Sequence, residues 1–417
     1  MFTFETVCVI GLGYIGLPTA AVLANSGPSV VGVDVTPNTV DTINQGKAHI
    51  IEVDLDGLLQ GVVARGALKA QTSPDNADVF IIAVPTPFRE NKAPDLSFVE
   101  SAVRSLAPFV REGNLLILES TVPPGATEEL VGWIEEERPD LKQSGGVGHS
   151  FFVAHCPERV LPGRVLVELI QNDRIIGGVT PQCALRAKAL YELFVRSECY
   201  LTNARTAELA KLTENAFRDV NIAFANELSL ICDDLSINVW ELIKLANKHP
   251  RVNILQPGPG VGGHCIAVDP WFIADASPGH ARLIKTARDI NDEKPSKVVA
   301  QVTAALHDTK QQTVAFFGLA FKADIDDLRE SPAIEIVSRV AKTPGIEIFV
   351  VEPNIDGLPS NLSTLGVQLV EAEKAIERAN VCVMLVDHKP FKQIDVDNLE
   401  GKILIDTRGV WSQVMKD

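Results

Sequence analysis

The sequence predicts an α/β protein in which two Rossmann-like, doubly wound domains are joined by a middle domain built on a long helix. Both end portions of the chain alternate short apolar, β-branched runs with helical patterns, which is typical of parallel strands buried on both faces. The middle portion has apolar residues at helical spacing over 206–235, without Pro or Gly. We therefore place a nucleotide-binding domain at 1–200, a helical domain at 201–300 and a second Rossmann-like domain at 301–417.

Short apolar runs mark the expected strands of each end domain. In the first domain they are 7–10, 30–33, 79–84, 115–118 and 152–154. In the last domain they are 313–317, 347–351, 381–386 and 403–406. A further helical pattern covers 240–247, before a Gly/Pro-rich loop at 256–270.

Composition excludes several classes of protein. The net charge of −16 argues against nucleic acid or an anionic membrane as a partner. No apolar run reaches membrane-spanning length, and residues 1–5 lack the basic segment of a signal peptide, so a cytoplasmic protein is expected. The seven cysteines are scattered without a Cys-x-x-Cys pair, which argues against a disulfide framework and against a structural zinc site. No metal is expected.

A dinucleotide-binding motif follows the first strand. The stretch Gly11-Leu12-Gly13-Tyr14-Ile15-Gly16 opens an apolar helix, as a pyrophosphate-binding turn requires. Asp34 ends the second strand 18 residues after Gly16, where a carboxylate would bind the ribose hydroxyls and repel a 2′-phosphate. The motif therefore predicts NAD rather than NADP. A glycine-rich turn without a ligand is the alternative.

Two later strand ends belong to the same edge of the sheet. Thr86 lies in Val84-Pro85-Thr86-Pro87, and Thr121 lies in the segment that runs from Glu119 to Gly125. Ligands of open α/β sheets bind beyond the carboxyl ends of the strands. We expect both threonines near the cofactor, although each segment alone is equally typical of a simple turn.

The glycine-rich loop 258–265 is the best candidate for catalysis. Its glycines, Gly262 among them, suit close approach of backbone to a ligand, and Cys265 ends the loop with Asp269 four residues further on. An isolated cysteine is more often an inert buried residue, but the flanking glycines and polar residues favour a reactive role for Cys265. His264 is interpreted as a positioning residue rather than a base.

Polar and basic residues elsewhere leave two interpretations open. Lys211, Asn215, Arg218 and Asn221 share one face of the long helix, which either is solvated or lines a cleft. Further candidates follow strands, where an anion would bind, although each cation could equally be an ordinary surface residue. They are Glu158-Arg159-Val160, Phe321-Lys322, Arg329 and Arg408.

Together these residues resemble the UDP-glucose/GDP-mannose dehydrogenase family over essentially the whole chain. The stretches 157–163 and 260–270 are similar to the branch that acts on UDP-N-acetylhexosamines. So are Asn215-Ala216-Phe217-Arg218-Asp219-Val220-Asn221 and His249-Pro250-Arg251-Val252-Asn253. One departure is Val53, where the family often has proline after an acidic residue.

The resemblance implies an NAD-dependent enzyme that oxidises C6 of a UDP-N-acetylhexosamine, N-acetylmannosamine being favoured, to a uronate for surface polysaccharide biosynthesis. It implies a homodimer in which Arg251 reaches the partner's substrate. The implied catalytic residues are Cys265, the nucleophile, and Lys211, Asn215, Asp269, Glu158 and Thr121. The implied cofactor residues are Gly11, Gly13, Tyr14, Ile15, Gly16, Asp34, Thr86, Thr121 and Arg329. The implied substrate residues are Arg159, Val160, Lys211, Asn215, Arg218, Arg251, Asn253, Gly262, Phe321, Lys322 and Arg408.

Other functions remain as alternatives at this point. The same chemistry on UDP-N-acetylglucosamine or UDP-glucose differs only in the sugar. A non-catalytic NAD sensor would not need the cysteine, lysine and carboxylates, all of which are present. A nucleotide-sugar epimerase would need no cysteine.

Overall fold

The computed structural model describes residues 2–142, 151–161, 163–263, 265–309 and 311–411. The chain divides into two compact units. The first comprises Met1–Glu214 and Asp275–Ser277, and the second comprises Asn215–Ala274 and Pro278–Asp417.

An eight-stranded sheet forms the centre of the first unit, in the order β3-β2-β1-β4-β5-β6-β7-β8. The strands are β1 (Thr6–Ile10), β2 (Ser29–Val33), β3 (Leu68–Gln71), β4 (Val79–Ile82), β5 (Asn114–Leu118), β6 (Phe151–His155), β7 (Arg174–Gly178) and β8 (Cys199–Asn203). The order reverses between β1 and β4, which is where open α/β sheets bind ligands. The expectation of a wholly parallel sheet is wrong at one point, because β6 and β7 are antiparallel.

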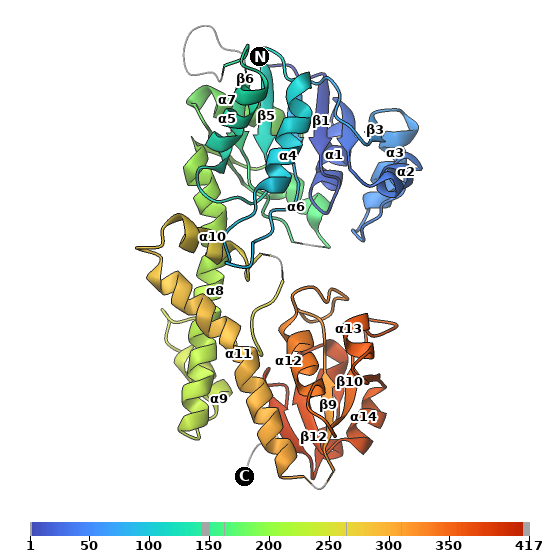
Figure 1. Ribbon diagram of the computed structural model, residues 1–417, viewed down its shortest axis with the longest axis vertical. Helices are drawn as coiled ribbons and strands as arrows, with labels where there is room; N and C mark the ends of the chain where they lie inside the picture. Colours follow the sequence, from blue (N-terminus) through green and yellow to red (C-terminus); the bar gives the residue numbers. More distant parts are fainter. Residues whose placement is uncertain (1, 143–150, 162, 264, 310, 412–417) are drawn as a thin grey trace. The chain divides into compact units, whose positions relative to one another are not determined.

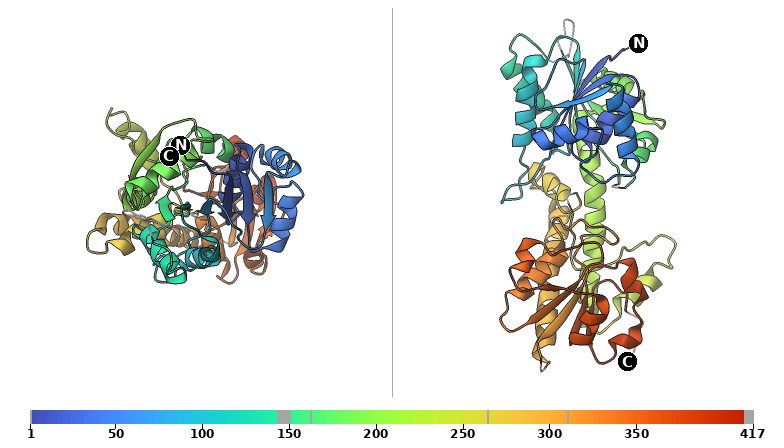
Figure 2. Two further views of the ribbon diagram at one scale, coloured as in Figure 1. Left: turned by 90° about the horizontal axis from the view of Figure 1, so that it is seen from above. Right: turned by 90° about the vertical axis from the view of Figure 1, so that its right-hand side faces the viewer.

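Helices cover both faces of this sheet (Figures 1 and 2). The helices are α1 (Gly16–Asn25), α2 (Pro37–Asn44), α3 (Leu55–Ala64), α4 (Ser97–Leu106), α5 (Ala126–Glu137), α6 (Val165–Gln171) and α7 (Pro181–Tyr191). Along β1, Val7 and Val9 pack with α1, α3 and α7 on one face, whereas Cys8 and Ile10 pack with α4 and α5 on the other. Strands buried on both faces explain the continuous apolar runs of the sequence.

Long helices dominate the middle of the chain. Helix α8 (Ala204–Asp234) begins in the first unit and continues into the second. The second unit adds α9 (Val239–Ala246), α10 (Asp269–Ala276) and α11 (Arg282–His307), of which α10 ends with two residues of the first unit. The 26-residue helix α11, which the sequence analysis did not predict, contains Pro295 in its interior.

The second unit also contains a five-stranded parallel sheet in the order β11-β10-β9-β12-β13. The strands are β9 (Thr313–Phe317), β10 (Glu347–Val351), β11 (Gln368–Leu369), β12 (Val381–Met384) and β13 (Ile403–Asp406). Helices α11, α12 (Pro332–Ala341) and α13 (Ser360–Ser363) pack on one face, and α14 (Ala372–Arg378) packs on the other (Figure 1). Three 3₁₀ turns lie at Ala107–Phe109, Lys389–Gln393 and Val396–Leu399.

The predicted fold class is confirmed: two Rossmann-like sheets accompany a middle region of long helices. Each predicted strand overlaps an observed one, and the predicted helix over 206–235 corresponds to α8. Within the described residues, no helix is both long and apolar enough to cross a membrane.

Candidate active site

The turn between β1 and α1 has the geometry of a dinucleotide-binding loop. Gly11 has φ +91°, and a Cβ there would come within 2.5 Å of the Ala83 carbonyl oxygen. A Cβ on Gly16 would overlap the Gly11 carbonyl oxygen, whereas a Cβ on Gly13 would meet nothing within 4 Å. Two glycines therefore close the turn, and the third leaves open space beside the start of α1. No side chain caps that helix N-terminus, so the site fits a pyrophosphate.

Two further predicted cofactor residues lie at the same edge of the sheet. The Asp34 carboxylate accepts hydrogen bonds from Leu12 N at 3.2 Å and Thr36 N at 2.9 Å, so it is held beside the glycine turn. Thr86, just beyond β4, has a buried hydroxyl without a hydrogen-bond partner in the described structure. A buried hydroxyl of this kind fits a ligand that supplies the missing bond.

The segment that carries Thr121 is fixed by a residue that sequence reasoning missed. Glu208, on the first turns of α8, accepts hydrogen bonds from Gly125 N at 2.6 Å and Thr127 N at 2.8 Å. It therefore caps α5 from outside, and burial raises the pKa of this carboxyl despite the three hydrogen bonds it accepts. Thr121 itself is partly buried.

Glu158 follows β6 and lies at the end of a buried ion pair. Its Oε2 is 2.9 Å from Arg174 Nη1, and its Oε1 accepts a hydrogen bond from Arg159 N at 2.6 Å. Only 9% of the Glu158 side chain is exposed. The neighbouring Arg159 forms a 2.8 Å ion pair with Glu214, and Val160 packs against the core.

Cys265 lies in the second unit at the beginning of the turn that leads into α10. It is exposed, whereas the other six cysteines are buried. Four residues on, Asp269 is buried and its Oδ2 accepts a 2.5 Å hydrogen bond from Asn215 Nδ2 of α8. The structure thus brings together two of the predicted catalytic side chains, Asn215 and Asp269, and Cys265 precedes Asp269 by four residues.

A buried polar network that the sequence analysis missed anchors both ends of the glycine-rich loop. Asn226 Oδ1 accepts a hydrogen bond from Gly258 N at 2.8 Å, and Asn226 Nδ2 donates to Asn291 at 2.8 Å. Arg288, fully buried, pairs with Asp219 and donates to the Ile266 carbonyl oxygen at 3.4 Å. Helices α8 and α11 therefore hold the loop before and after Cys265.

The same loop packs against strand ends of the second sheet. A Cβ on Gly258 would lie 2.9 Å from Arg408 Nη1, and a Cβ on Gly263 would lie 3.1 Å from the Phe321 ring. A Cβ on Gly262 would lie 2.7 Å from Pro332 Cδ. Phe321 follows β9 and Arg408 follows β13, and burial lowers the pKa of Arg408. Three predicted substrate residues, Gly262, Phe321 and Arg408, thus belong to one cluster.

The remaining predicted residues have simpler surroundings. Arg329 forms a bidentate ion pair with Asp327, at 2.6 and 2.8 Å. Lys211 lies one turn before Asn215 on α8 and is partly buried. Tyr14, Arg218, Arg251, Asn253 and Lys322 are exposed, and Ile15 is partly buried. His264 lies outside the described residues.

Comparison with known proteins decides the family. Family models of the UDP-glucose/GDP-mannose dehydrogenases match residues 5–195 (NAD binding domain), 205–293 (central domain) and 315–413 (UDP binding domain). The chain belongs to the UDP-glucose/GDP-mannose dehydrogenase family.

Individual relatives are similar over nearly their full length. The NDP-N-acetyl-D-galactosaminuronic acid dehydrogenase of Ralstonia nicotianae is 59% identical, over 98% of this chain and 97% of the relative. The UDP-N-acetyl-D-mannosamine dehydrogenase of Escherichia coli K12 is 57% identical, over 98% and 100%. The solved structure of UDP-D-ManNAc dehydrogenase from Pyrococcus horikoshii aligns with a TM-score of 0.87 at 40% identity, over 97% and 96% of the two chains.

Family membership explains the chemistry of the two units. The family's NAD binding domain contains the glycine turn, Asp34 and Thr86, so NAD is the cofactor, and its role is to accept hydride. The family's UDP binding domain contains Phe321 and Arg408. The glycine-rich loop with Cys265 lies between them in the sequence and falls within the central domain.

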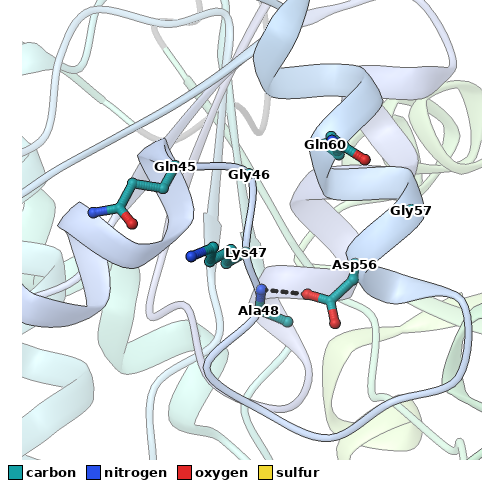
Figure 3. Close-up of a pocket in the computed structure, with 7 residues that line it drawn as sticks. All are labelled: Gln45, Gly46, Lys47, Ala48, Asp56, Gly57 and Gln60. Atoms are coloured by element: carbon teal, nitrogen blue, oxygen red, sulfur yellow. Dashed lines mark hydrogen bonds between the residues drawn. The ribbon is translucent and has the colours of Figure 1, made fainter.

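One pocket of the first unit is lined by none of these residues. It is formed where α2 ends and α3 runs past, and it is lined by Gln45, Gly46, Lys47, Ala48, Asp56, Gly57 and Gln60 (Figure 3). The Asp56 carboxylate already accepts a 2.7 Å hydrogen bond from Ala48 N. No residue predicted for the site lines this pocket, and we do not assign it a role in the reaction.

Proposed function

We propose that this enzyme oxidises C6 of UDP-N-acetyl-D-mannosamine to the uronate, with two NAD consumed per product. The observation that carries the proposal is the exposed thiol of Cys265 on a loop anchored at both ends, four residues before the buried Asp269, which accepts a hydrogen bond from Asn215. An enzyme that only converted an alcohol to an aldehyde would not require a nucleophile there.

The first oxidation removes hydride from C6 and a proton from the hydroxyl group. Lys211, or a water held by Asp269, accepts that proton. The Cys265 thiolate then adds to the aldehyde, which forms a C–S bond and a thiohemiacetal. Removal of a second hydride and the remaining hydroxyl proton leaves a thioester on Cys265. Lys211 and Asn215 stabilise the oxyanions that arise at these steps.

Hydrolysis completes the reaction. Water attacks the thioester carbonyl, the C–S bond breaks, and the products are the uronate and the Cys265 thiol. Glu158 accepts the proton of the attacking water, with Thr121 assisting. On the substrate, Lys322 and Arg408 bind the UDP portion, with Phe321 and Gly262 against it. Arg329 serves the cofactor, and Arg159, Val160, Arg218 and Asn253 complete the sugar site.

The identity of the sugar rests on the relatives. UDP-N-acetyl-D-mannosamine dehydrogenases are 57% identical over the full length and also supply the similar solved structure with a TM-score of 0.87. The 59% identity of the Ralstonia enzyme, named for N-acetyl-D-galactosaminuronic acid, makes the galacto isomer the second candidate. Turnover of UDP-N-acetylmannosamine, UDP-N-acetylgalactosamine, UDP-N-acetylglucosamine and UDP-glucose, compared by kcat/KM, distinguishes them, and a preference for any of the last three contradicts the proposal.

The mechanism is tested by counting NADH and by mass spectrometry of the intact enzyme. Wild type should form two NADH per uronate. Cys265→Ser should bind both ligands yet lose net turnover and accumulate an ester, because an alkoxide is harder to form than a thiolate and its ester hydrolyses slowly. Cys265→Ala should at most form aldehyde slowly.

A matched control is Cys232→Ala, since Cys232 is a buried cysteine on α8 outside the site. This variant should keep the wild-type stoichiometry. Uronate production by Cys265→Ala at a near-normal rate would mean that oxidation proceeds through an aldehyde hydrate, and the role of Cys265 would be wrong.

Assembly is part of the proposal. Phe217, Phe224 and Ile231 recur every seven residues on α8 and are 67%, 49% and 46% exposed. Large apolar side chains at this spacing form one stripe along a helix, which is typical of a helix–helix interface. We propose that a second copy of the chain covers the stripe, so that the exposed Arg251 reaches the partner's substrate. We place the dimer in the cytoplasm, with UDP-sugar and NAD as its small-molecule partners.

A further inference from the structure

Behind Glu158, in the first unit, lies a buried cluster of charges that the proposed reaction does not use. Arg174, the first residue of β7, is 3% exposed and pairs with Glu158 at 2.9 Å. Glu119, which follows β5, is 2% exposed. Tyr191, the last residue of α7, is fully buried and donates a 2.6 Å hydrogen bond to Glu119 Oε1. The cluster thus contains two carboxyl groups and one arginine.

The contacts of the cluster come from several elements of the first unit. Thr19 of α1 donates to Glu119 Oε2 at 3.5 Å. The Arg174 guanidinium carbon lies 4.9 Å from the centre of the Tyr191 ring, and Arg174 Nη1 lies 3.8 Å from Cys156 Sγ. A continuous chain of contacts therefore joins the helix of the dinucleotide-binding turn to Glu158.

The charges of this cluster are not balanced when all its groups are ionised, because two carboxylates then share one arginine. A buried ion pair costs desolvation free energy and contributes net stability only with good geometry, so a second buried carboxyl beside a single arginine is unfavourable when both are ionised. Burial raises the pKa of Glu119 to about 7, against the opposing charge of Arg174 and with the added repulsion of Glu158. Burial alone would lower the pKa of Arg174, but Glu158 and the other acidic groups raise it above its ordinary value.

We propose that Arg174 and Glu119 are positioning residues for Glu158: Arg174 fixes the Glu158 carboxylate, and Glu119 balances Arg174 from the buried side. This inference rests on the proposed role of Glu158 in thioester hydrolysis. When Glu119 is ionised, it shares the charge of Arg174, and Glu158 accepts a proton from water more readily. When Glu119 is protonated, the positive charge of Arg174 acts on Glu158 alone. The Glu158 carboxylate then accepts a proton less readily, and hydrolysis slows.

The experiment separates hydrolysis from the two oxidations. Wild type, Glu119→Gln, Tyr191→Phe and Arg174→Lys are mixed with UDP-N-acetylmannosamine and NAD from pH 6 to 9, and the NADH burst and the Cys265 adduct are followed by absorbance and mass spectrometry. Glu119→Gln should keep the burst, accumulate the adduct and hydrolyse it about tenfold more slowly at pH 8, because only part of what a general base contributes to the rate is lost. In Glu119→Gln, the rate of adduct hydrolysis should also no longer rise with pH near 7. The rate of adduct hydrolysis by Tyr191→Phe should lie between the rates of wild type and Glu119→Gln.

Arg174→Lys should show the larger loss, because a lysine cannot reproduce the planar guanidinium. The matched control is Glu128→Gln, since Glu128 forms an exposed ion pair with Arg205 on the same unit; it should behave as wild type. Hydrolysis by Glu119→Gln with the wild-type rate and pH profile overturns the inference and leaves the proposed function intact, as does an equal loss in the burst and in hydrolysis. Absence of any UDP-sugar-dependent NADH in wild type instead refutes the proposed function.

Discussion

The single carboxylate of Asp34 has two roles. It orders the glycine turn through Leu12 N and Thr36 N, and it presents negative charge where the ribose of the cofactor would lie. A 2′-phosphate placed there would meet Coulomb repulsion, so we expect NAD to be preferred over NADP even without a steric clash.

Asp34→Asn should therefore narrow the preference for NAD over NADP by roughly tenfold to a hundredfold in kcat/KM, since removal of one charge repulsion is worth a few kcal/mol at most. Steady-state kinetics with both cofactors measures it. Asp41→Asn, an exposed change on the neighbouring helix α2, is the control. An unchanged ratio in Asp34→Asn would remove the electrostatic explanation.

The buried carboxyl group of Glu119 should also make the stability of the folded chain depend on pH. Its pKa in the folded chain, about 7, lies above the ordinary value of 4.5, so the folded state binds its proton more tightly than the unfolded state does. The contribution of Glu119 to stability is therefore complete below pH 4.5 and is lost as pH rises through 7, by up to about 3 kcal/mol. His155 acts oppositely, since burial lowers its pKa to about 3 and stability falls as pH drops below 6.5.

Glu119→Gln should consequently gain stability relative to wild type between pH 5 and pH 8. The difference in thermal unfolding midpoint between the two proteins measures it, and the effect of His155 cancels because both proteins share it. A difference that does not vary with pH would show that Glu119 is ionised or protonated throughout this range.

At the residue scale, the sequence predicted what local chain geometry determines. Gly11, Gly13 and Gly16 act within one turn, so their spacing is sufficient to identify them. Arg174 and Arg288 were not predicted, because their partners are distant in the chain: Asp219 precedes Arg288 by 69 residues. Only the folded structure brings such charges together, and a lone arginine inside an apolar pattern carries no signal of its partner.

At the scale of elements, strands with continuous apolar sequences were easier to predict than short or polar strands. The central strand β1 is almost wholly buried and has an apolar sequence, whereas β8 is mostly exposed or half-buried and ends in the polar residues Thr202 and Asn203. The two-residue strand β11 exists only through its pairing with β10. Hydrogen bonding to a neighbour, not composition, defines these strands, so the sequence analysis missed them.

In the glycine turn before α1, one glycine should be required for folding and another for binding of NAD, and substitutions can distinguish the two roles. Gly16→Ala should destabilise the unit by several kcal/mol, because its Cβ overlaps the backbone of Gly11. Gly13→Ala should leave the unfolding midpoint within a few degrees of wild type, yet raise KM for NAD at least about tenfold, since its Cβ enters only the open space where we expect the pyrophosphate. Thermal unfolding and kinetics on both variants measure this. A normal KM in Gly13→Ala would place the cofactor elsewhere.

At the scale of the whole molecule, the proposed dimer would complete each active site with Arg251 of the other chain. The stripe of Phe217, Phe224 and Ile231 exposes large apolar side chains to water, which a second copy would remove from solvent. In a symmetric dimer the same surface of both chains forms the interface. A residue that reaches into the partner's site therefore does so in each of the two chains. Two inactive single variants can then complement each other, and this is the sharpest test of the assembly.

Arg251→Ala and Cys265→Ala should each be inactive alone and should regain activity when mixed and allowed to exchange subunits. In a hybrid dimer, one site combines the intact Cys265 of one chain with the intact Arg251 of the other, and the second site has both defects. Random exchange makes half of the dimers hybrid, so about one quarter of wild-type activity should return. The control adds Phe224→Asp to both chains, which places a charge in the stripe and should abolish both dimer formation and recovery. No recovery from proven hybrid dimers would mean that Arg251 serves its own subunit, and full activity in a stable monomer would contradict the shared site altogether.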